Sequence, residues 1–308
     1  FYYEPLLGIH PTNQKEKFDF LGKKMMNPIW ISSMTGGTEL AYTINHRLAI
    51  ACKEFGLGMG LGSCRLLLQD DEYLKDFDVR KIIGDEFPLF ANLGIAQIEQ
   101  LIQQNQTKKI TELVSKLSAD GLIIHVNPLQ EWLQPEGDIF ENPPIETIQK
   151  LVDSTKGDLN IIVKEVGQGM GKESLKTLLK LPLTAIDFAA SGGTNFSIIE
   201  LSRNQKDQQE AHSPLAYVGH SAENMVEMCN DLLVELKGAV KCNEIIISGG
   251  VKNYLDGYFL TEKLNMSAVY GQASQLLKQA IISQESLHDY LTQQIKGLAL
   301  AKQFLKVR

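Results

Sequence analysis

The stretch from Gly121 to Asp138 constrains the fold of this chain more than any other. It begins with an uninterrupted apolar run, Gly-Leu-Ile-Ile, which is typical of a strand buried on both faces. It then changes to polar side chains, namely His125, Asn127, Gln130, Glu131, Gln134 and Glu136. Polar groups directly after a buried strand are where an α/β barrel carries its chemistry. The stretch therefore predicts a barrel strand that ends in functional residues.

Seven further segments repeat this succession of an apolar strand, a polar or glycine-rich end and an amphipathic helix. The eight expected strands are residues 28–34, 56–63, 88–94, 121–125, 160–167, 185–190, 244–250 and 267–271. The expected helices are residues 39–55, 66–83, 95–117, 146–155, 174–180, 222–237, 254–264 and 276–308, the last segment forming one or two helices. Eight such units predict an α/β fold, a (β/α)8 TIM barrel formed as a single domain by residues 1–308.

Three segments do not fit the repeat. Residues 1–24 show no period, and we expect them to form an N-terminal lead-in outside the barrel. Residues 204–210, NQKDQQE, are expected to be an exposed excursion. Residues 214–220 could form a ninth strand, but we interpret them as part of a long connection.

Composition narrows the class of protein. The chain has 308 residues, a net charge of −7 and a pI of about 5.5, which disfavour nucleic acid and anionic membranes as partners. The four cysteines are far apart and form no CxxC pair, so we expect a reduced, cytoplasmic protein without a zinc site. No apolar run approaches the roughly 20 residues that span a bilayer, and no signal peptide is visible.

Glycines at the ends of three expected strands suggest a phosphate site. They are Gly192-Gly193, Gly249-Gly250 and the single Gly271, and each could also be only a tight turn. In many barrels the last two strands supply such a site, because glycines let backbone N–H groups turn toward an anion. Together the three positions favour phosphate binding.

Lys164 lies within an otherwise apolar strand, where an unpaired charge is costly. One interpretation pairs its ammonium with the carboxylate of Glu165. The other places it beside the electron-rich ring of a flavin, where a cation near N1 favours the anionic reduced form.

Other polar residues also allow two interpretations. Glu131 is either an exposed acid or the single protein carboxylate on a Mg²⁺ that otherwise binds water and substrate phosphates. Arg65 either forms a surface ion pair or binds a substrate phosphate. His125 could be a satisfied core histidine. Cys64 could be a nucleophile, but nothing nearby lowers its pKa, so we expect a plain small residue.

Nearly the whole chain resembles the type 2, FMN-dependent isopentenyl diphosphate isomerases. The block H-x-NPLQE at residues 125–131, followed by QPEGD at 134–138, is the most specific marker. The others are MTGG at 34–37, GS-x-R at 62–65, NLG at 92–94, VKEVG-x-GM at 163–170, GGTN at 192–195 and SGG at 248–250.

The resemblance implies FMN across the barrel mouth and Mg²⁺ on the substrate diphosphate, held by Glu131. It implies that the FMN contacts are Ser33, Met34, Thr35, Ser63, Asn92, Lys164, Thr194, Gly249, Gly250, Gly271, Ala273 and Ser274. It implies that the residues facing the substrate are Ser63, Arg65, His125, Asn127 and Gln130, the last three as catalytic residues. NADPH would serve only to reduce FMN. We also expect a homo-oligomer, which is common for barrels.

The implied reaction interconverts isopentenyl and dimethylallyl diphosphate by adding a proton at one allylic carbon and removing one at another. Gln130 is central in the motif but has no useful acid form. The proton must therefore come from elsewhere, and reduced flavin tuned by Lys164 is a reasonable carrier.

Three features depart from the family pattern. The family usually has Gln at the position of Cys64, and Ser-Gly where this chain has Ala189-Ala190. The family's N-terminal Arg-Lys…His segment, which binds the diphosphate, is not found, and we expect it upstream of Phe1.

Other functions remain as alternatives. An FMN-dependent 2-hydroxy-acid oxidoreductase would need a His base and Arg residues near the sixth strand, which ends instead in SGGTN. An enzyme like inosine monophosphate dehydrogenase would need its nucleophilic Cys on a mid-barrel loop, whereas Cys64 follows the second strand. The non-enzyme alternative is a flavin-binding barrel that has lost catalysis, or a barrel that serves as a structural or regulatory subunit. A barrel that binds no flavin would purify without the yellow colour.

Overall fold

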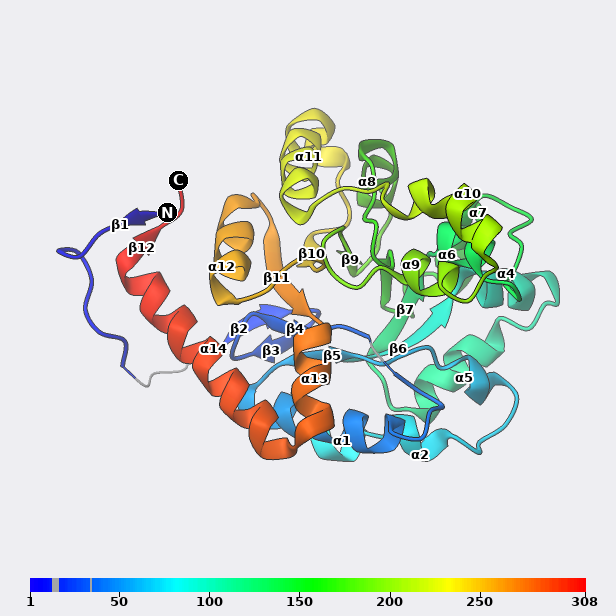
Figure 1. Cartoon of the computed structure of the whole chain (residues 1–308), viewed down its shortest axis with the longest axis horizontal. Helices are drawn as coiled ribbons and strands as arrows, with labels where there is room; N and C mark the ends of the chain where they lie inside the picture. The colour runs from blue at the N-terminus through cyan, green and yellow to red at the C-terminus, as the bar shows by residue number, and fades with distance from the viewer. Residues whose placement is uncertain (13–16, 34) are drawn as a thin grey trace.

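A closed barrel of eight parallel strands forms the centre of the computed structural model, which describes residues 1–12, 17–33 and 35–308 (Figure 1). In barrel order the strands are β4 (Ile29–Ile31), β5 (Gly58–Gly60), β6 (Leu89–Gly94), β7 (Gly121–His125), β8 (Ile161–Lys164), β9 (Ala185–Asp187), β10 (Glu244–Ile247) and β11 (Ser267–Gln272). Every predicted strand is present, so the predicted (β/α)8 fold is confirmed.

Helices connect the strands on the outside of the barrel. They are α1 (Ala41–Phe55), α4 (Ile95–Gln103), α5 (Lys108–Lys116), α6 (Pro128–Leu133), α7 (Pro144–Thr155), α8 (Lys172–Leu179), α11 (Ala222–Leu236), α12 (Tyr254–Lys263), α13 (Ser274–Ile282) and α14 (Gln284–Phe304). Their buried faces pack on the outer faces of the strands and form the larger of the hydrophobic clusters.

Two predicted helices are broken. Residues 66–83 form a 3-10 turn η1 (Arg65–Leu68) and two short helices, α2 (Leu74–Phe77) and α3 (Arg80–Ile83). The Asp70 carboxylate accepts the backbone N–H of Glu72, and such a local bond competes with helix continuation. The predicted helix 95–117 is interrupted at Asn105, whose φ of 56° is left-handed.

The polar stretch predicted as an exposed excursion is mostly helical. Residues 204–210 lead into α10 (Lys206–Ala216), which follows the short helix α9 (Phe196–Leu201). Residues 214–220 form no barrel strand, which confirms their interpretation as a connection.

The N-terminal segment is closer to the core than expected. Tyr2–Tyr3 (β1) pairs with Leu305–Lys306 (β12), so the two chain ends lie side by side (Figure 1). Phe18–Phe20 (β2) and Lys23–Met25 (β3) form a separate hairpin. Its residues Phe20, Leu21 and Met25 are fully or almost fully buried against the barrel interior. The last part of the predicted lead-in therefore packs against the core, whereas we expected it to lie outside the barrel.

The barrel interior is layered, because side chains along a strand alternate between its two faces. The inner apolar layer consists of Trp30, Phe90, Ile123, Ile162, Ala185, Ile246 and Val269, closed from one end by the hairpin. Two residues further along each of these strands lies a second inward position. These positions carry Ser32, Asn92, His125, Lys164, Asp187, Ser248 and Gly271. The seven residues form what we call the polar layer, at the carboxyl ends of the strands.

Candidate functional site

A cavity of about 320 Å³ opens above the polar layer, and we call it the mouth cavity. It brings together most of the residues predicted to contact a cofactor. Those that line it are Ser33, Lys164, Thr194, Gly249, Gly250, Gly271, Ala273 and Ser274. Met34, also predicted, lies outside the described residues. Asn92, Ser63 and Thr35 do not line this cavity, although Asn92 belongs to the polar layer.

One end of the mouth cavity is built from backbone. Gly249 and Gly250 have φ values of 85° and 75°, in the left-handed region that favours glycine. A Cβ on Gly249 would lie 2.0 Å from the carbonyl oxygen of Ala190, and one on Gly193 would lie 3.0 Å from the nitrogen of Gly250. Helix α13 begins beside them, directly after Ala273. Two glycine turns and a helix N-terminus provide backbone N–H groups of the kind that bind phosphate.

The Lys164 ammonium projects into the mouth cavity from the end of β8. Its Nζ donates to the backbone carbonyl of Glu165 at 2.7 Å, and its side chain is only 8% exposed. The Glu165 carboxylate instead accepts the backbone N–H groups of Gly167, Gln168 and Gly169. The pairing of Lys164 with the Glu165 carboxylate was therefore wrong.

Several buried polar atoms around the polar layer have no hydrogen-bond partner among the described residues. They are Ser32 Oγ, Ser33 Oγ, Ser63 Oγ, Asn127 Oδ1, Asp187 Oδ2 and Gln272 Nε2. Buried polar groups are nearly always hydrogen-bonded in native proteins, so this concentration marks a ligand site. The turns at Gly193 and Gly249–Gly250 and the start of α13 form what we call the phosphate cradle. With this cradle and the Lys164 ammonium, the set fits a flavin mononucleotide, whose ring edge carries both donors and acceptors.

His125 is held in one tautomer by Asn92. Its Nδ1 lies 2.8 Å from Asn92 Oδ1, while Asn92 Nδ2 donates to the carbonyl of Leu61 at 3.0 Å. Asn92 Oδ1 is therefore the acceptor, and His125 Nδ1 carries the hydrogen. Burial, with Lys164 and Arg65 nearby, lowers the pKa of His125 from 6.5 to about 3. The ring is neutral at physiological pH and acts as a hydrogen-bonding group rather than an acid.

This lowered pKa predicts a specific loss of stability in acid. The unfolded chain binds a proton at His125 near pH 6.5, whereas the folded chain binds it near pH 3. Stability should fall as the pH falls through this window, by up to about 1.4 kcal/mol per pH unit from this group. Urea unfolding at pH 7, 6 and 5 measures the slope. A His125→Asn variant should show a shallower slope, and equal slopes in both proteins would contradict the assignment.

The three polar residues of the NPLQE motif bond to one another. Asn127 Nδ2 donates to Glu131 Oε1 at 2.7 Å and to Gln130 Oε1 at 3.2 Å. The second oxygen of Glu131 accepts the backbone N–H of Asp138 at 2.8 Å. The motif is thus a preorganised turn at the start of α6. Pro128 begins that helix, in the position where its missing N–H costs nothing.

Gln130 also reaches a residue that the sequence did not single out. Its Nε2 donates to Glu200 Oε1 at 3.1 Å, and Glu200 on α9 is 7% exposed. The other carboxylate oxygen of Glu200 accepts from Arg203. Arg203, just after α9, also forms an ion pair with Glu136, just after the motif. The α9 region therefore contacts the loop of the motif at two points. Because residues 130 and 200 are 70 positions apart, no local pattern in the sequence signals this contact.

The remaining predicted residues lie on two neighbouring loops. Arg65 is exposed beside His125, and no carboxylate of the described residues pairs with it. Ser63 precedes it with a buried, unpartnered hydroxyl. Thr35 Oγ1 lies 3.2 Å from Thr38 Oγ1. Burial raises the pKa of Cys64 to about 12, which makes its thiol unreactive and confirms that it is a plain small residue.

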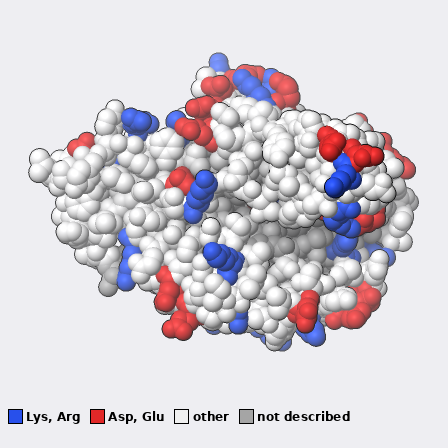
Figure 2. All heavy atoms as spheres, viewed as in Figure 1, with Lys and Arg blue, Asp and Glu red and all other residues white. Residues whose placement is uncertain are grey.

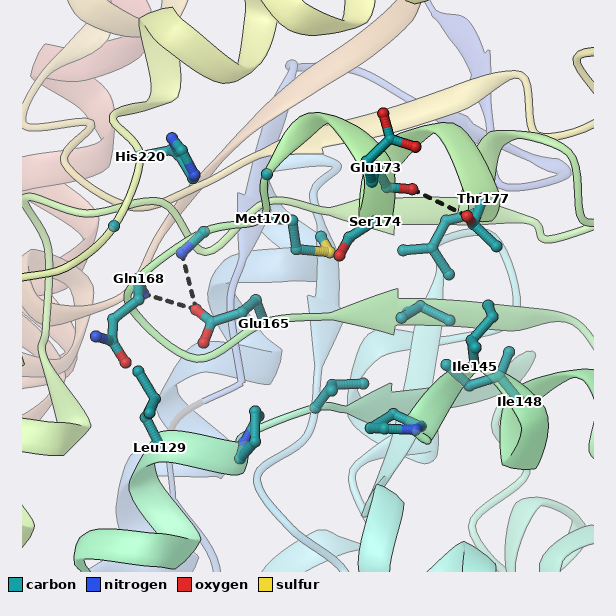
Figure 3. Close-up of a pocket in the computed structure, with 18 of the residues that line it drawn as sticks. Leu129, Ile145, Ile148, Glu165, Gln168, Met170, Glu173, Ser174, Thr177 and His220 are labelled. Atoms are coloured by element: carbon teal, nitrogen blue, oxygen red, sulfur yellow. Dashed lines mark hydrogen bonds between the residues drawn. The ribbon is translucent and has the colours of Figure 1, made fainter. Parts of the chain in front are cut away.

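A larger cavity of about 480 Å³ lies outside the barrel, between α7 and α8 (Figure 3). Ile145 and Ile148 line one side, Ser174 and Thr177 the other, and Glu165 projects into it. Because Glu165 follows Lys164, their side chains leave β8 on opposite faces. The carboxylate of Glu165 therefore shapes the loop that follows Lys164. This cavity contains none of the predicted catalytic residues.

Removing this carboxylate should loosen the loop. Glu165→Ala would leave the N–H groups of Gly167, Gln168 and Gly169 without their acceptor, at a cost of roughly 3 kcal/mol. Thermal unfolding measures the loss. Glu173→Ala, an exposed acid in the same cavity, is the matched control and should change stability by less than about 0.5 kcal/mol. Equal effects of the two substitutions would contradict the role given to Glu165.

Charges of both signs are mixed on one face of the molecule. Lys and Arg are interspersed with Asp and Glu on the face shown in Figure 2 and form no continuous basic area. Among the described residues no helix is long and apolar enough to cross a membrane. Within the same part of the chain, no group of three or more His, Cys, Asp or Glu could hold a metal ion by itself.

Comparison with solved structures shows the same fold. The chain matches a lactate oxidase described as putative from Pediococcus acidilactici with a TM-score of 0.61, covering 96% of this chain and 79% of that one. It matches a mandelate oxidase variant with (S)-mandelic acid with a TM-score of 0.59, covering 96% and 81%. Both are 12% identical in sequence.

Comparison with curated sequences shows the family. No family model matches the chain. An isopentenyl-diphosphate delta-isomerase of Rickettsia typhi is 35% identical over 301 residues, which are 97% of this chain and 84% of that protein. The protein of the same name from Rickettsia prowazekii is 38% identical over 266 residues, 86% of this chain and 73% of that protein. The chain therefore belongs to the isopentenyl-diphosphate delta-isomerase family and is an isomerase.

Proposed function

We propose that the chain interconverts isopentenyl and dimethylallyl diphosphate at the mouth cavity with reduced FMN, and with Mg²⁺ on the substrate diphosphate. The observation that carries the proposal is the polar layer with its unpartnered buried atoms, set between a phosphate cradle and the NPLQE turn. NADPH would be needed only to reduce the flavin, because the isomerisation involves no net redox change.

The residues that would bind FMN are already in position in the folded chain. The turns at Gly193 and Gly249–Gly250 and the first turn of α13 would take the phosphate. Lys164 and the unpartnered hydroxyls of Ser32 and Ser33 would contact the ring and its side chain. Reduced flavin, when bound, supplies a nitrogen that can give and take a proton. The Lys164 ammonium favours negative charge on that ring.

The substrate would lie between the flavin ring and the NPLQE turn. Arg65 is exposed and free of described carboxylates, as expected for a group that binds the diphosphate. His125 is neutral and donates only toward Asn92, so it can orient the substrate without protonating it. Gln130 and Asn127 would hold the substrate in one orientation, so that a proton is added at one allylic carbon and another is removed from a second.

Glu131 would hold Mg²⁺ through a lone pair left after its bonds to Asn127 and Asp138. Glu131→Gln should raise the Mg²⁺ concentration for half-maximal isomerisation by about tenfold, since one charged ligand of a hard cation is lost. A Mg²⁺ titration of the initial rate measures this. Glu141→Gln, an exposed acid in the following loop, should leave the titration unchanged. If Glu131→Gln and the parent enzyme gave the same titration curve, Glu131 would not be a ligand of the metal.

The fold alone also permits oxidation of a 2-hydroxy acid, as the names of the structural neighbours indicate. No His or Arg is among the described residues that line the mouth cavity, and the nearby His125 is a poor base because its pKa is lowered to about 3. Arg203, the nearest candidate after β9, is engaged by Glu136 and Glu200. The site therefore favours the isomerase over the oxidase.

The two functions are separated by one pair of assays on the same preparation. The chain is loaded with FMN and given either isopentenyl diphosphate, Mg²⁺ and dithionite, or a 2-hydroxy acid and oxygen. We expect conversion of the diphosphate and no hydrogen peroxide from the acid. Peroxide formation without isomerisation would support the oxidase, and FMN binding without either activity would support a barrel that has lost catalysis.

A further inference from the structure

Asp187 is a buried carboxylate that neither the sequence patterns nor the proposed reaction uses. It ends β9, is 0% exposed and occupies the polar layer beneath the mouth cavity. Its neighbours alternate as expected: Ala185 faces the barrel interior and Ile186 the helices. Asp187 therefore faces the interior, where a carboxylate without a partner charge would cost several kcal/mol.

The charge that faces Asp187 is Lys164. The two residues are directly paired in the register of β8 and β9, and both point inward. The Lys164 charge lowers the pKa of Asp187, against burial, which raises it and is the larger effect. Within the described residues the two side chains form no ion pair within 4.0 Å. They are neighbours in one layer without direct contact.

Each member of this pair keeps unused bonding capacity. The ammonium of Lys164 uses one donor, on the carbonyl of Glu165. Asp187 Oδ1 accepts from the hydroxyl of Ser248, which itself accepts the N–H of Ala189 at 2.9 Å. Asp187 Oδ2 has no partner among the described residues. Lys164 and Ser248 both line the mouth cavity, so the group reaches the place where the flavin ring would lie.

We propose that Asp187 is a positioning residue that tunes the bound flavin: ionised against the Lys164 ammonium and the Ser248 hydroxyl, its carboxylate offsets that positive charge beneath the ring. The inference rests on the proposed use of FMN. With both charges present, only part of the reduced flavin would be anionic. The rest would keep the proton that the isomerisation requires. Without Asp187, the ammonium acts unopposed, and the ring becomes easier to reduce and poorer at holding that proton.

The reduction potential of bound FMN tests this directly. Asp187→Asn keeps the shape and an acceptor for Ser248 but removes the charge. We expect it to favour the reduced flavin by about tenfold, a rise of about 30 mV for two electrons. The pH at which reduced flavin becomes anionic, followed by absorbance, should fall by about one unit. Lys164→Met should move both quantities in the opposite direction.

Asp158→Asn is the matched control for charge. Asp158 is exposed in the turn before β8, at the opposite end of the barrel, and the same substitution there should leave the potential unchanged. A wild-type potential and wild-type flavin titration in Asp187→Asn, with FMN bound, would overturn the inference. The proposed function would stand in that case, because it fails only if the parent chain binds no FMN or does not isomerise.

A second measurement needs no flavin and covers the case in which Asp187→Asn folds poorly. Each single substitution leaves one buried charge without its counter-charge, so Lys164→Met and Asp187→Asn should each lower the unfolding midpoint of the FMN-free chain. The double variant should be more stable than the sum of the two losses predicts. Additive losses would show that the two charges do not interact and would contradict the proposal.

Discussion

Gly249→Ala is expected to weaken FMN binding by about a hundredfold. The added Cβ would lie 2.0 Å from the carbonyl oxygen and 2.2 Å from the nitrogen of Ala190, both backbone atoms that cannot rotate away. Gly249 also has φ of 85°, which costs a side chain roughly 1–2 kcal/mol. Overpacking and strain together amount to about 3 kcal/mol. The FMN-free loop of the variant should relax away from this geometry, and FMN must restore it, which costs about two powers of ten in affinity.

Fluorescence titration of flavin-free protein with FMN measures this loss. Gly238→Ala is the control, because a Cβ there has no atom within 4 Å. It should bind FMN as the parent chain does. If Gly249→Ala also retained the parent affinity, the phosphate cradle would have to be placed elsewhere on the barrel.

The second large effect is expected at the closed end of the barrel. Asp120 forms an ion pair with Lys23 Nζ at 2.6 Å and accepts hydrogen bonds from Arg80 Nη2 at 2.7 Å and from the N–H of Leu89 at 2.8 Å. Arg80 is 6% exposed, so its guanidinium has little water to replace a lost carboxylate. Asp120→Asn should therefore lower the free energy of unfolding by about 3–5 kcal/mol.

Chemical denaturation at constant temperature measures this loss. Asp19→Asn breaks the exposed pair with Lys24 on the same hairpin and should cost less than about 1 kcal/mol. Comparable losses at the two positions would mean that the Asp120 cluster does not fasten the hairpin to the barrel. In either case the proposed flavin site lies at the other end of the barrel, so FMN affinity per folded molecule should be unchanged.

The barrel could be predicted because each of its strands is a local signal. Runs such as Gly121–Ile124 and Ile161–Val163 are apolar on both faces, and only a sheet covered on both sides buries them. The helices were less predictable, since single side chains end them. The bond from Asp70 to the N–H of Glu72 and the left-handed Asn105 each break a helix that an apolar period alone would continue.

The functional site was predictable where a motif is contiguous. The NPLQE turn and the glycine pairs lie where the sequence placed them, because each is formed by neighbouring residues. Glu200 was missed because its contact with Gln130 comes from a different connection of the barrel. Asp187 was missed because it lies inside an apolar strand, and its partner Lys164 belongs to another strand. The hairpin at residues 18–25 was missed because its strands have only three residues each.

The central claim is that the mouth cavity uses reduced flavin to move protons without consuming electrons. Turnover per reducing equivalent tests it most directly. FMN-loaded chain is reduced once, without oxygen, and given Mg²⁺ and excess isopentenyl diphosphate in D₂O. The account predicts many molecules of dimethylallyl diphosphate per flavin, with solvent deuterium incorporated into the product and the flavin still reduced at the end. One product or fewer per flavin, with the flavin oxidised, would contradict it.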